Sequence, residues 1–297
     1  MRLDTANRAF AAFLGVCAAT LALVGMAACT LLGIVAYRVR HDGFDALSGS
    51  TADVTAALVF LTLVAVGSLL GLLSLWHQWS ATTGLVRHLR AHRLPLPASL
   101  TAAAERAALT GRVDLVDSGE QFSFAYGITS RRVAVSRGLV ESVSPTELDA
   151  VLEHERYHVT NLDPIKIVFA RTLAPALFFL PALRDLRTRY TAARELAADR
   201  RAVERYGRVP LASALYKVVS GPQWAALGPA AAIGGAEFLD DRVTQLETGK
   251  EPPARRLSVW TGALSVLGAS VLVWSFAASV IPFGGPGELA RRLCGQG

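Results

Sequence analysis

The most informative stretch of the sequence is Leu152-Glu153-His154-Glu155-Arg156-Tyr157-His158-Val159, which contains the pattern HExxH. On a helix, His154 and His158 are four residues apart, so both imidazoles project from one face. Glu155 then lies beside them and can reach a metal-bound water. The pattern therefore predicts a zinc site with two histidine ligands and a glutamate that acts as a general base.

Signals for the start and the end of a helix surround this stretch. Ser144 can serve as the N-cap, Pro145 fits the first helical position, and Glu147 completes a capping box. Asp163-Pro164 closes the segment, because the residue before a proline resists the helical conformation. The sequence therefore supplies the helix that the HExxH pattern needs.

A catalytic zinc ion needs three protein ligands and one open position for water. Glu195 is the candidate third ligand, because it lies in a stretch from Thr191 to Tyr206 that contains no Gly or Pro and is typical of a helix. Asp199 is one turn further on the same face and can accept a hydrogen bond from a ligand histidine. The alternative is that both carboxylates only solvate an arginine-rich helix. The need for a third donor favours the ligand role, with one Zn²⁺ per chain.

These residues together predict hydrolysis of a peptide bond. Zinc lowers the pKa of its bound water towards about 7, and Glu155 can then take a proton from that water and return it to the leaving amine. The group that stabilises the oxyanion is not identifiable from the sequence. Tyr157, Tyr190 and Tyr206 are candidates, although each can equally be a packing residue.

The composition is that of a membrane protein. Hydrophobic residues make up 52% of the chain and charged residues 18%, against about 25% charged residues in ordinary soluble domains. The net charge of +6 fits basic loops on the inner side of a membrane better than nucleic-acid binding, because no basic stripe is interleaved with aromatic residues. The three cysteines form no CxxC pair, which argues against a disulfide framework and a cysteine metal site.

Three apolar runs are long enough to cross a bilayer, which takes about 20 residues. The first can also be read as a signal peptide, but it is longer than the roughly 7–15 residues of a signal h-region, which favours a retained span. We therefore expect three parts. They are an N-terminal membrane region (1–76) with transmembrane helices at about 9–37 and 54–76, a zinc metalloprotease domain (77–256), and a C-terminal transmembrane helix with a short tail (257–297).

The distribution of basic residues predicts the orientation of these spans. Residues 77–256 hold 24 of the 30 Lys and Arg residues, and Arg87, Arg90 and Arg93 lie close to the second span. Lys and Arg accumulate on the cytoplasmic side of membrane proteins. We therefore expect the N-terminus and the protease domain in the cytoplasm and the C-terminal tail outside.

A fourth apolar stretch, residues 165–183, is a poor free-standing span because it contains two basic residues and two prolines. His158 and Glu195 flank this stretch and must meet at one metal ion, so a single crossing between them is excluded. We expect a buried or re-entrant helix, or a tightly folded pair of half-spans.

Two short apolar segments, residues 121–126 and 132–136, predict a β-hairpin with a turn at 127–130. One of the two strands can be an exposed edge that binds an extended substrate. An ordinary core hairpin is an equally good interpretation.

The sequence resembles the BlaR/MecR-type integral-membrane zinc metallopeptidases and, more distantly, the HtpX/Ste-type membrane proteases. The matching pieces are Phe124-Ala125-Tyr126-Gly127, Val133-Ala134-Val135-Ser136-Arg137-Gly138-Leu139, Ser144-Pro145-Thr146-Glu147-Leu148, the HExxH segment, Asp163-Pro164, Phe178-Phe179-Leu180-Pro181 and Arg194-Glu195-Leu196-Ala197-Ala198-Asp199.

The resemblance implies a mainly α membrane protein with three transmembrane helices and a gluzincin-type α+β metalloprotease domain that contains a small β-hairpin or sheet. It also implies that His154, His158 and Glu195 bind zinc and that Glu155 is the base. The expected location is the bacterial plasma membrane, and the expected role is regulated proteolysis. The sequence departs from the antibiotic sensors of the family, which carry a large penicillin-binding domain after their last span. Here only a short tail follows Phe283, so we expect the protease core without the sensor domain.

The expected substrate is a protein or peptide, either a cytoplasmic regulator or a membrane protein subject to quality control. The expected partners are this substrate and the lipid bilayer, with a possible homo-oligomer and no nucleic acid. The rival hypothesis is a non-catalytic membrane signalling or adaptor protein that keeps zinc as a structural element. Structural zinc sites usually have four protein ligands, and the sequence offers no suitable fourth ligand, which favours catalysis.

Overall fold

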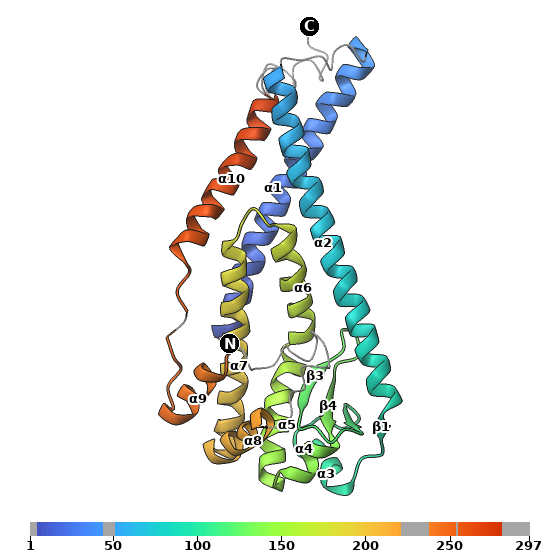
Figure 1. Cartoon of the computed structure of the whole chain (residues 1–297), viewed down its shortest axis with the longest axis vertical. Coiled ribbons are helices and arrows are strands. Elements are labelled where there is room, and N and C mark those ends of the chain that lie inside the picture. The colour runs from blue at the N-terminus through green and yellow to red at the C-terminus, as the bar shows by residue number, and fades with distance from the viewer. Residues whose placement is uncertain (1–4, 44–50, 221–237, 254, 281–297) are drawn as a thin grey trace. The chain divides into compact units, whose positions relative to one another are not determined.

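The computed structural model describes residues 5–43, 51–220, 238–253 and 255–280. In these ranges the chain is mostly helical, with a small sheet (Figure 1). The elements are α1 (Thr5–Asp42), α2 (Thr51–Ala91), β1 (Arg93–Leu94), α3 (Ala98–Arg106), β2 (Val113–Val116), β3 (Ser123–Tyr126), β4 (Arg132–Ser136), α4 (Arg137–Ser142), α5 (Pro145–Thr160), α6 (Asp163–Ala176), α7 (Ala182–Tyr206), α8 (Arg208–Ser220), α9 (Leu239–Thr248) and α10 (Val259–Val280).

The chain divides into two compact units. The sheet-containing unit comprises Met1–Ala11, Ser74–Arg171 and Leu186–Arg256. The span unit comprises Ala12–Leu73, Thr172–Asp185 and Leu257–Gly297.

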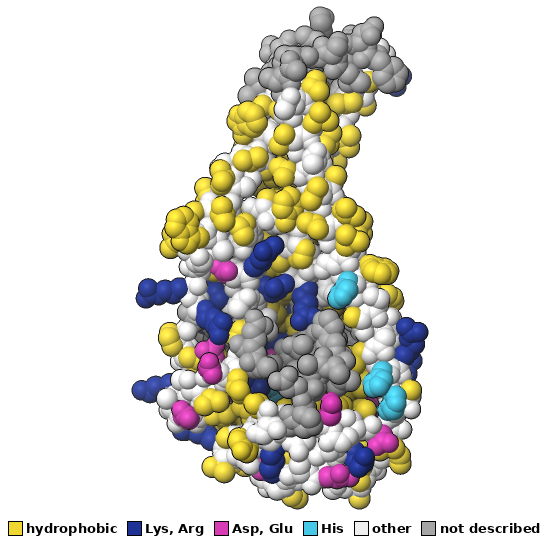
Figure 2. Space-filling model, viewed as in Figure 1, with side chains coloured by type: hydrophobic (Ala, Val, Ile, Leu, Met, Phe, Trp, Pro, Cys, Tyr) yellow, Lys and Arg dark blue, Asp and Glu magenta, His cyan; other side chains and the backbone are white. Residues whose placement is uncertain are grey.

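The three expected membrane spans are confirmed by three long apolar helices. Their candidate spans are Ala6–His41 in α1, Val54–Ala91 in α2 and Val259–Val280 in α10. Large apolar side chains such as Leu72, Val266 and Trp274 are exposed on them. Figure 2 shows hydrophobic side chains gathered on one part of the surface. The second helix continues without a break to Ala91, beyond the end expected at residue 76, and with 41 residues it is roughly 61 Å long. It therefore extends well past a hydrocarbon core of about 30 Å.

The apolar stretch 165–183 forms two helices joined by a turn. The first, α6, ends at Ala176, directly after Pro175, and the second, α7, begins at Ala182, directly after Pro181. Within the span unit, a Cβ atom placed on Gly67 of α2 would collide with the backbone carbonyl of Ala176. Glycine therefore permits a close approach between α2 and the end of α6. Whether this tip lies in the bilayer stays a prediction.

The described strands form one four-stranded sheet in the order β1-β2-β4-β3. The predicted hairpin is present, because β3 and β4 pair antiparallel with Phe124 opposite Ala134. Gly127 at its turn has a φ of +90°, which glycine adopts without strain. Two strands were not predicted: β2, which pairs parallel to β4, and the two-residue β1.

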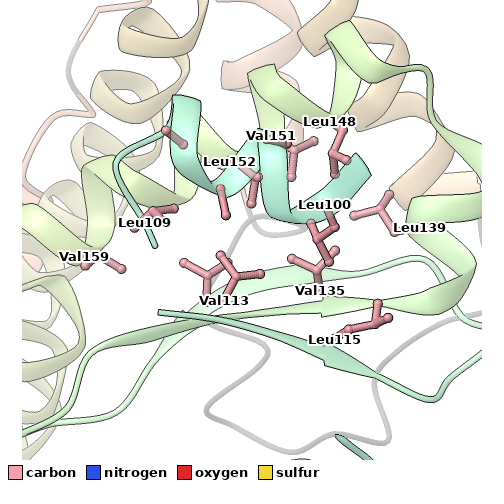
Figure 3. Close-up of a cluster of buried hydrophobic side chains, with 14 of the residues drawn as sticks. Leu100, Leu109, Val113, Leu115, Val135, Leu139, Leu148, Val151, Leu152 and Val159 are labelled. Carbon is pink, nitrogen blue, oxygen red and sulfur yellow. The ribbon is translucent and has the colours of Figure 1, made fainter. Parts of the chain in front are cut away.

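Helix α5 packs on this sheet through one apolar face. Leu148, Leu152 and Val159 of α5 belong to one buried cluster with Val113 and Val135 of the sheet (Figure 3). Fully burying one such leucine contributes roughly 1.5–3 kcal/mol. This packing orients the helix, so that its other face carries the two histidines.

The start of α5 is fixed by the expected capping box. The hydroxyl of Ser144 accepts a hydrogen bond from the Glu147 amide at 3.3 Å, and the Ser144 amide donates to the Glu147 carboxylate at 2.6 Å. Lys217 of α8 lies 2.7 Å from the same carboxylate. The cap therefore also ties the HExxH helix to α8.

Candidate metal centre

The structure brings the three predicted zinc ligands together. His154 and His158 on α5 have their Nε2 atoms 3.1 Å apart. Glu195 on α7 places Oε2 at 3.6 Å from Nε2 of His154 and Oε1 at 3.8 Å from Nε2 of His158. All three side chains are buried.

These distances suit a zinc ion. Ligand atoms about 2.0–2.1 Å from a tetrahedral zinc ion are roughly 3.3–3.4 Å apart, close to the separations between the side chains. Oε2 of Glu195 is buried and has no hydrogen-bond partner among the described residues. A carboxylate oxygen that serves as a metal ligand would have this environment. Within the described ranges, no fourth His, Cys, Asp or Glu joins the group. The donor set therefore fits a three-ligand site with an open position.

Asp199, the carboxylate expected beside a ligand histidine, lies next to the ring of His154. The Nδ1 atom of His154 lies 2.8 Å from Oδ1 of Asp199. Burial alone would lower the pKa of His154, but the neighbouring carboxylates of Asp199 and Glu195 raise it to about 9 in the metal-free protein. Arg242 of α9 donates two hydrogen bonds of 2.7 Å to Asp199. Sequence reasoning missed Arg242, which is 43 residues away in the chain and lies in no motif.

The ring of His158 is oriented by Asp163, which sequence reasoning treated only as the end of the HExxH segment. Oδ2 of Asp163 lies 2.7 Å from Nδ1 of His158, and the hydroxyl of Tyr190 donates to Oδ1 of Asp163 at 3.1 Å. A carboxylate five residues after the second histidine was the available signal. The hydroxyl of Tyr190, a candidate for oxyanion stabilisation, is therefore engaged with a carboxylate.

Glu195 is held as an anion. Arg194, which is only 2% exposed, places its guanidinium 2.5 Å from Oε1 of Glu195. Burial would raise the pKa of Glu195, but Arg194 and the two histidines hold it well below its ordinary value. The site thus presents two imidazoles and one carboxylate, a combination that zinc prefers.

Glu155 lies in a pocket beside both histidines. Its side chain is buried, and its Oε2 atom has no hydrogen-bond partner among the described residues. The pocket offers about 100 Å³ of open space. Arg194 and Arg242 also line it, whereas none of the described lining residues is a tyrosine. The apolar lining comes from β3 and its preceding residue, α5, α6 and α8, and includes Phe122, Phe124, Ala125, Val151, Ile167, Leu211, Leu215 and Val218.

The strand that borders this pocket, β3, is at the edge of the described sheet. The Ser136 amide donates to the Phe122 carbonyl at 3.0 Å, so Phe122 and, by alternation, Phe124 direct their backbone groups toward β4. The backbone groups of Ser123 and Ala125 therefore point away from β4, on the open side of the strand. Both residues line the pocket that holds Glu155.

Comparisons with known proteins find similarity to proteases. A family model described as BlaR1 peptidase M56 matches residues 23–246. A protease HtpX homolog of Aeropyrum pernix is 30% identical over 169 residues, which cover 54% of this chain and 48% of that protein. The HtpX homolog of Thermoplasma acidophilum is 38% identical over 64 residues (22% of this chain, 20% of that protein), and HtpX homolog 2 of Methanosarcina mazei is 40% identical over 60 residues (20% of each). The chain spans at most about half the length of these relatives.

Proposed function

Because the chain belongs to the BlaR1 peptidase M56 family, we propose that it is an integral-membrane, zinc-dependent endopeptidase. The observation that carries the proposal is the convergence of His154, His158 and Glu195 beside Glu155, in a pocket that borders a strand edge. The three apolar helices, each long enough to cross a membrane, support the membrane location. The similarity to proteins named as HtpX proteases supports the same activity.

His154, His158 and Glu195 would hold one zinc ion. The ion would act as a Lewis acid that lowers the pKa of a water molecule and polarises the scissile carbonyl. Glu155 would accept the proton of the attacking water and return it to the leaving nitrogen. Asp199 and Asp163 would each orient one imidazole so that its Nε2 atom faces the metal, because each carboxylate lies next to the Nδ1 atom of its histidine.

The substrate would bind in an extended conformation along β3. The backbone groups of Ser123 and Ala125 can pair with it as an added strand. The pocket wall formed by Val151, Leu211 and Leu215 would receive an apolar side chain next to the scissile bond. These features suit a polypeptide that exposes apolar residues, such as a cytoplasmic regulator with an unfolded segment or a misfolded membrane protein.

The distribution of charge supports one orientation in the membrane. The sheet-containing unit holds the site, and most of the basic residues of the chain lie between the second and third spans. We place this unit on the cytoplasmic side of a bacterial plasma membrane, because Lys and Arg accumulate there. The role in the cell would then be regulated proteolysis or quality control of membrane proteins.

The decisive variant is Glu155→Gln, which keeps the size of the side chain and removes the base. We expect it to bind as much zinc as the wild type and to lose cleavage of casein at least 100-fold, the lower part of the range for general-base catalysis. Glu204→Gln is the matched control, because Glu204 is exposed on α7 and should leave cleavage unchanged.

Unchanged cleavage by Glu155→Gln would contradict the assigned base. A wild-type protein that binds zinc and cleaves nothing would favour the non-catalytic adaptor. Comparing the proteomes of cells that carry the wild type and Glu155→Gln would then identify substrates, as proteins that accumulate uncut in the variant.

A further inference from the structure

The N-terminal end of α1 contacts the helices that carry the metal site. Residues 1–11 belong to the sheet-containing unit, although the rest of α1 belongs to the span unit. Asn7 donates to the side chain of Asn161, the C-cap residue of α5, at 3.3 Å. The side-chain oxygen of Asn7, Oδ1, accepts a hydrogen bond of 2.5 Å from Lys166 of α6. One turn of α1 is thus attached to the end of the HExxH helix and to the helix that follows it.

Phe10, one turn further along α1, packs against Tyr190 of α7. The centres of the two rings are 5.0 Å apart and the ring planes are inclined by 46°, a distance at which aromatic pairs attract each other. The ammonium group of Lys166 lies 5.6 Å from the centre of the Phe10 ring. Phe10 therefore contacts both α6 and α7.

Tyr190 connects this contact to a candidate metal ligand. Its ring is only 1% exposed, and its hydroxyl donates to Asp163, which in turn lies 2.7 Å from Nδ1 of His158. Burial and the neighbouring Asp163 raise the pKa of Tyr190, so its hydroxyl keeps the proton that it donates. Asp163 is also buried, at 2% exposure, so bulk water cannot readily replace the tyrosine. The contacts form an unbroken path from Phe10 to His158.

We propose that Phe10 and Tyr190 are positioning residues for the metal centre, with Phe10 holding the Tyr190 ring and Tyr190 holding Asp163 against His158. The proposal rests on the proposed function in one respect, which is that His158 is a zinc ligand. It adds that the N-terminal end of the first candidate span contributes to metal affinity. The alternative is that Phe10 only packs helices together. The loss of Phe10 would then not affect metal affinity through the Tyr190 hydroxyl.

The test is a double-mutant cycle on the full-length protein, with zinc affinity measured by competition with a chelating dye. Tyr190→Phe removes only the hydroxyl and keeps the ring against Phe10. Direct partners of ligand histidines affect metal affinity by about 10–100-fold. Tyr190 contacts Asp163 and not the ligand histidine itself, so the effect should be smaller. We expect roughly a threefold to tenfold loss of zinc affinity for Tyr190→Phe and for Phe10→Ala. Combining the two changes should cost little more than either one alone, because both act on the same contact.

Two further variants separate positioning from general damage. Phe10→Tyr keeps an aromatic ring on Tyr190 and should retain wild-type affinity. Phe60→Ala removes a ring from the span unit that is 1% exposed and packs on Phe276, and it should leave zinc affinity unchanged. Cobalt-substituted protein gives a second readout, because its visible spectrum reports the arrangement of ligands and should change in Tyr190→Phe.

The outcomes are distinct. Wild-type zinc affinity in Tyr190→Phe would overturn the proposal, and this variant still tests it if Phe10→Ala does not fold. Fully additive losses, or an equal loss in Phe60→Ala, would also overturn it, because the effect would then not run through the hydroxyl. Absence of zinc binding in the wild type would instead contradict the proposed function.

Discussion

The substitution Arg242→Met should destabilise the protein strongly. Asp199 is fully buried and accepts two hydrogen bonds of 2.7 Å from Arg242. Methionine fills much of the space of the arginine but removes both hydrogen bonds to Asp199, while His154 stays beside it. Removing one partner of a buried ion pair typically costs 3–5 kcal/mol, because the remaining charge stays in a poorly solvated place. We expect a loss of about 3–5 kcal/mol in the free energy of unfolding.

The measurement is unfolding of the metal-free protein in detergent, since bound zinc would add its own stabilisation. The double variant Arg242→Met/Asp199→Asn removes both charges and should be more stable than Arg242→Met alone. Arg137→Met, which removes an exposed pair with Asp117, is the control and should change stability little. A loss below about 1 kcal/mol for Arg242→Met, or a double variant less stable than the single one, would refute this explanation of Arg242.

Three further perturbations test other parts of the structure. Burial alone would raise the pKa of Glu147, but hydrogen bonds, led by that from Lys217, lower it to about 2. Its contribution to stability should therefore be complete above about pH 4.5 and be lost as the pH falls towards 2, and pH-dependent unfolding of Glu147→Gln should lack this component. Gly67→Val should lower the yield of folded protein and its melting temperature, because a side chain there meets the backbone of Ala176; a wild-type melting temperature would contradict the close approach. Asp163→Asn should weaken zinc binding about 10–100-fold in a chelator competition, since it disturbs a ligand imidazole; unchanged affinity would exclude that role.

Local sequence signals predicted the parts of the fold that depend on neighbours in the chain. The capping box at Ser144 and Glu147 and the hairpin turn at Gly127 are each encoded within a few residues, and the structure has both. The three spans are predicted for the same reason, because length and hydropathy are properties of a continuous segment. The two prolines of residues 165–183 argued against a free-standing span, and in the structure they lie next to the end of α6 and the start of α7, although sequence alone left several arrangements open.

Features that depend on distant residues were missed. The parallel pairing of β2 with β4 needs a crossover, which no hydrophobic pattern specifies. Arg242 reaches Asp199 from another helix, so its role follows only from the packing of α9. Asp163 has two roles, since it begins α6 and also lies against His158. Its position before Pro164 explained it as a helix boundary, so its contact with the histidine was not predicted.

The central claim is that His154, His158 and Glu195 hold one zinc ion with an open coordination position. X-ray absorption spectroscopy of the purified protein, together with its metal content, tests this claim most directly. We predict one zinc ion per chain, with two imidazole ligands, no sulfur and the remaining donors oxygen, and loss of most of the metal in Glu195→Ala. A protein without zinc, a site with four protein ligands, or full zinc occupancy with unchanged affinity in Glu195→Ala would contradict it.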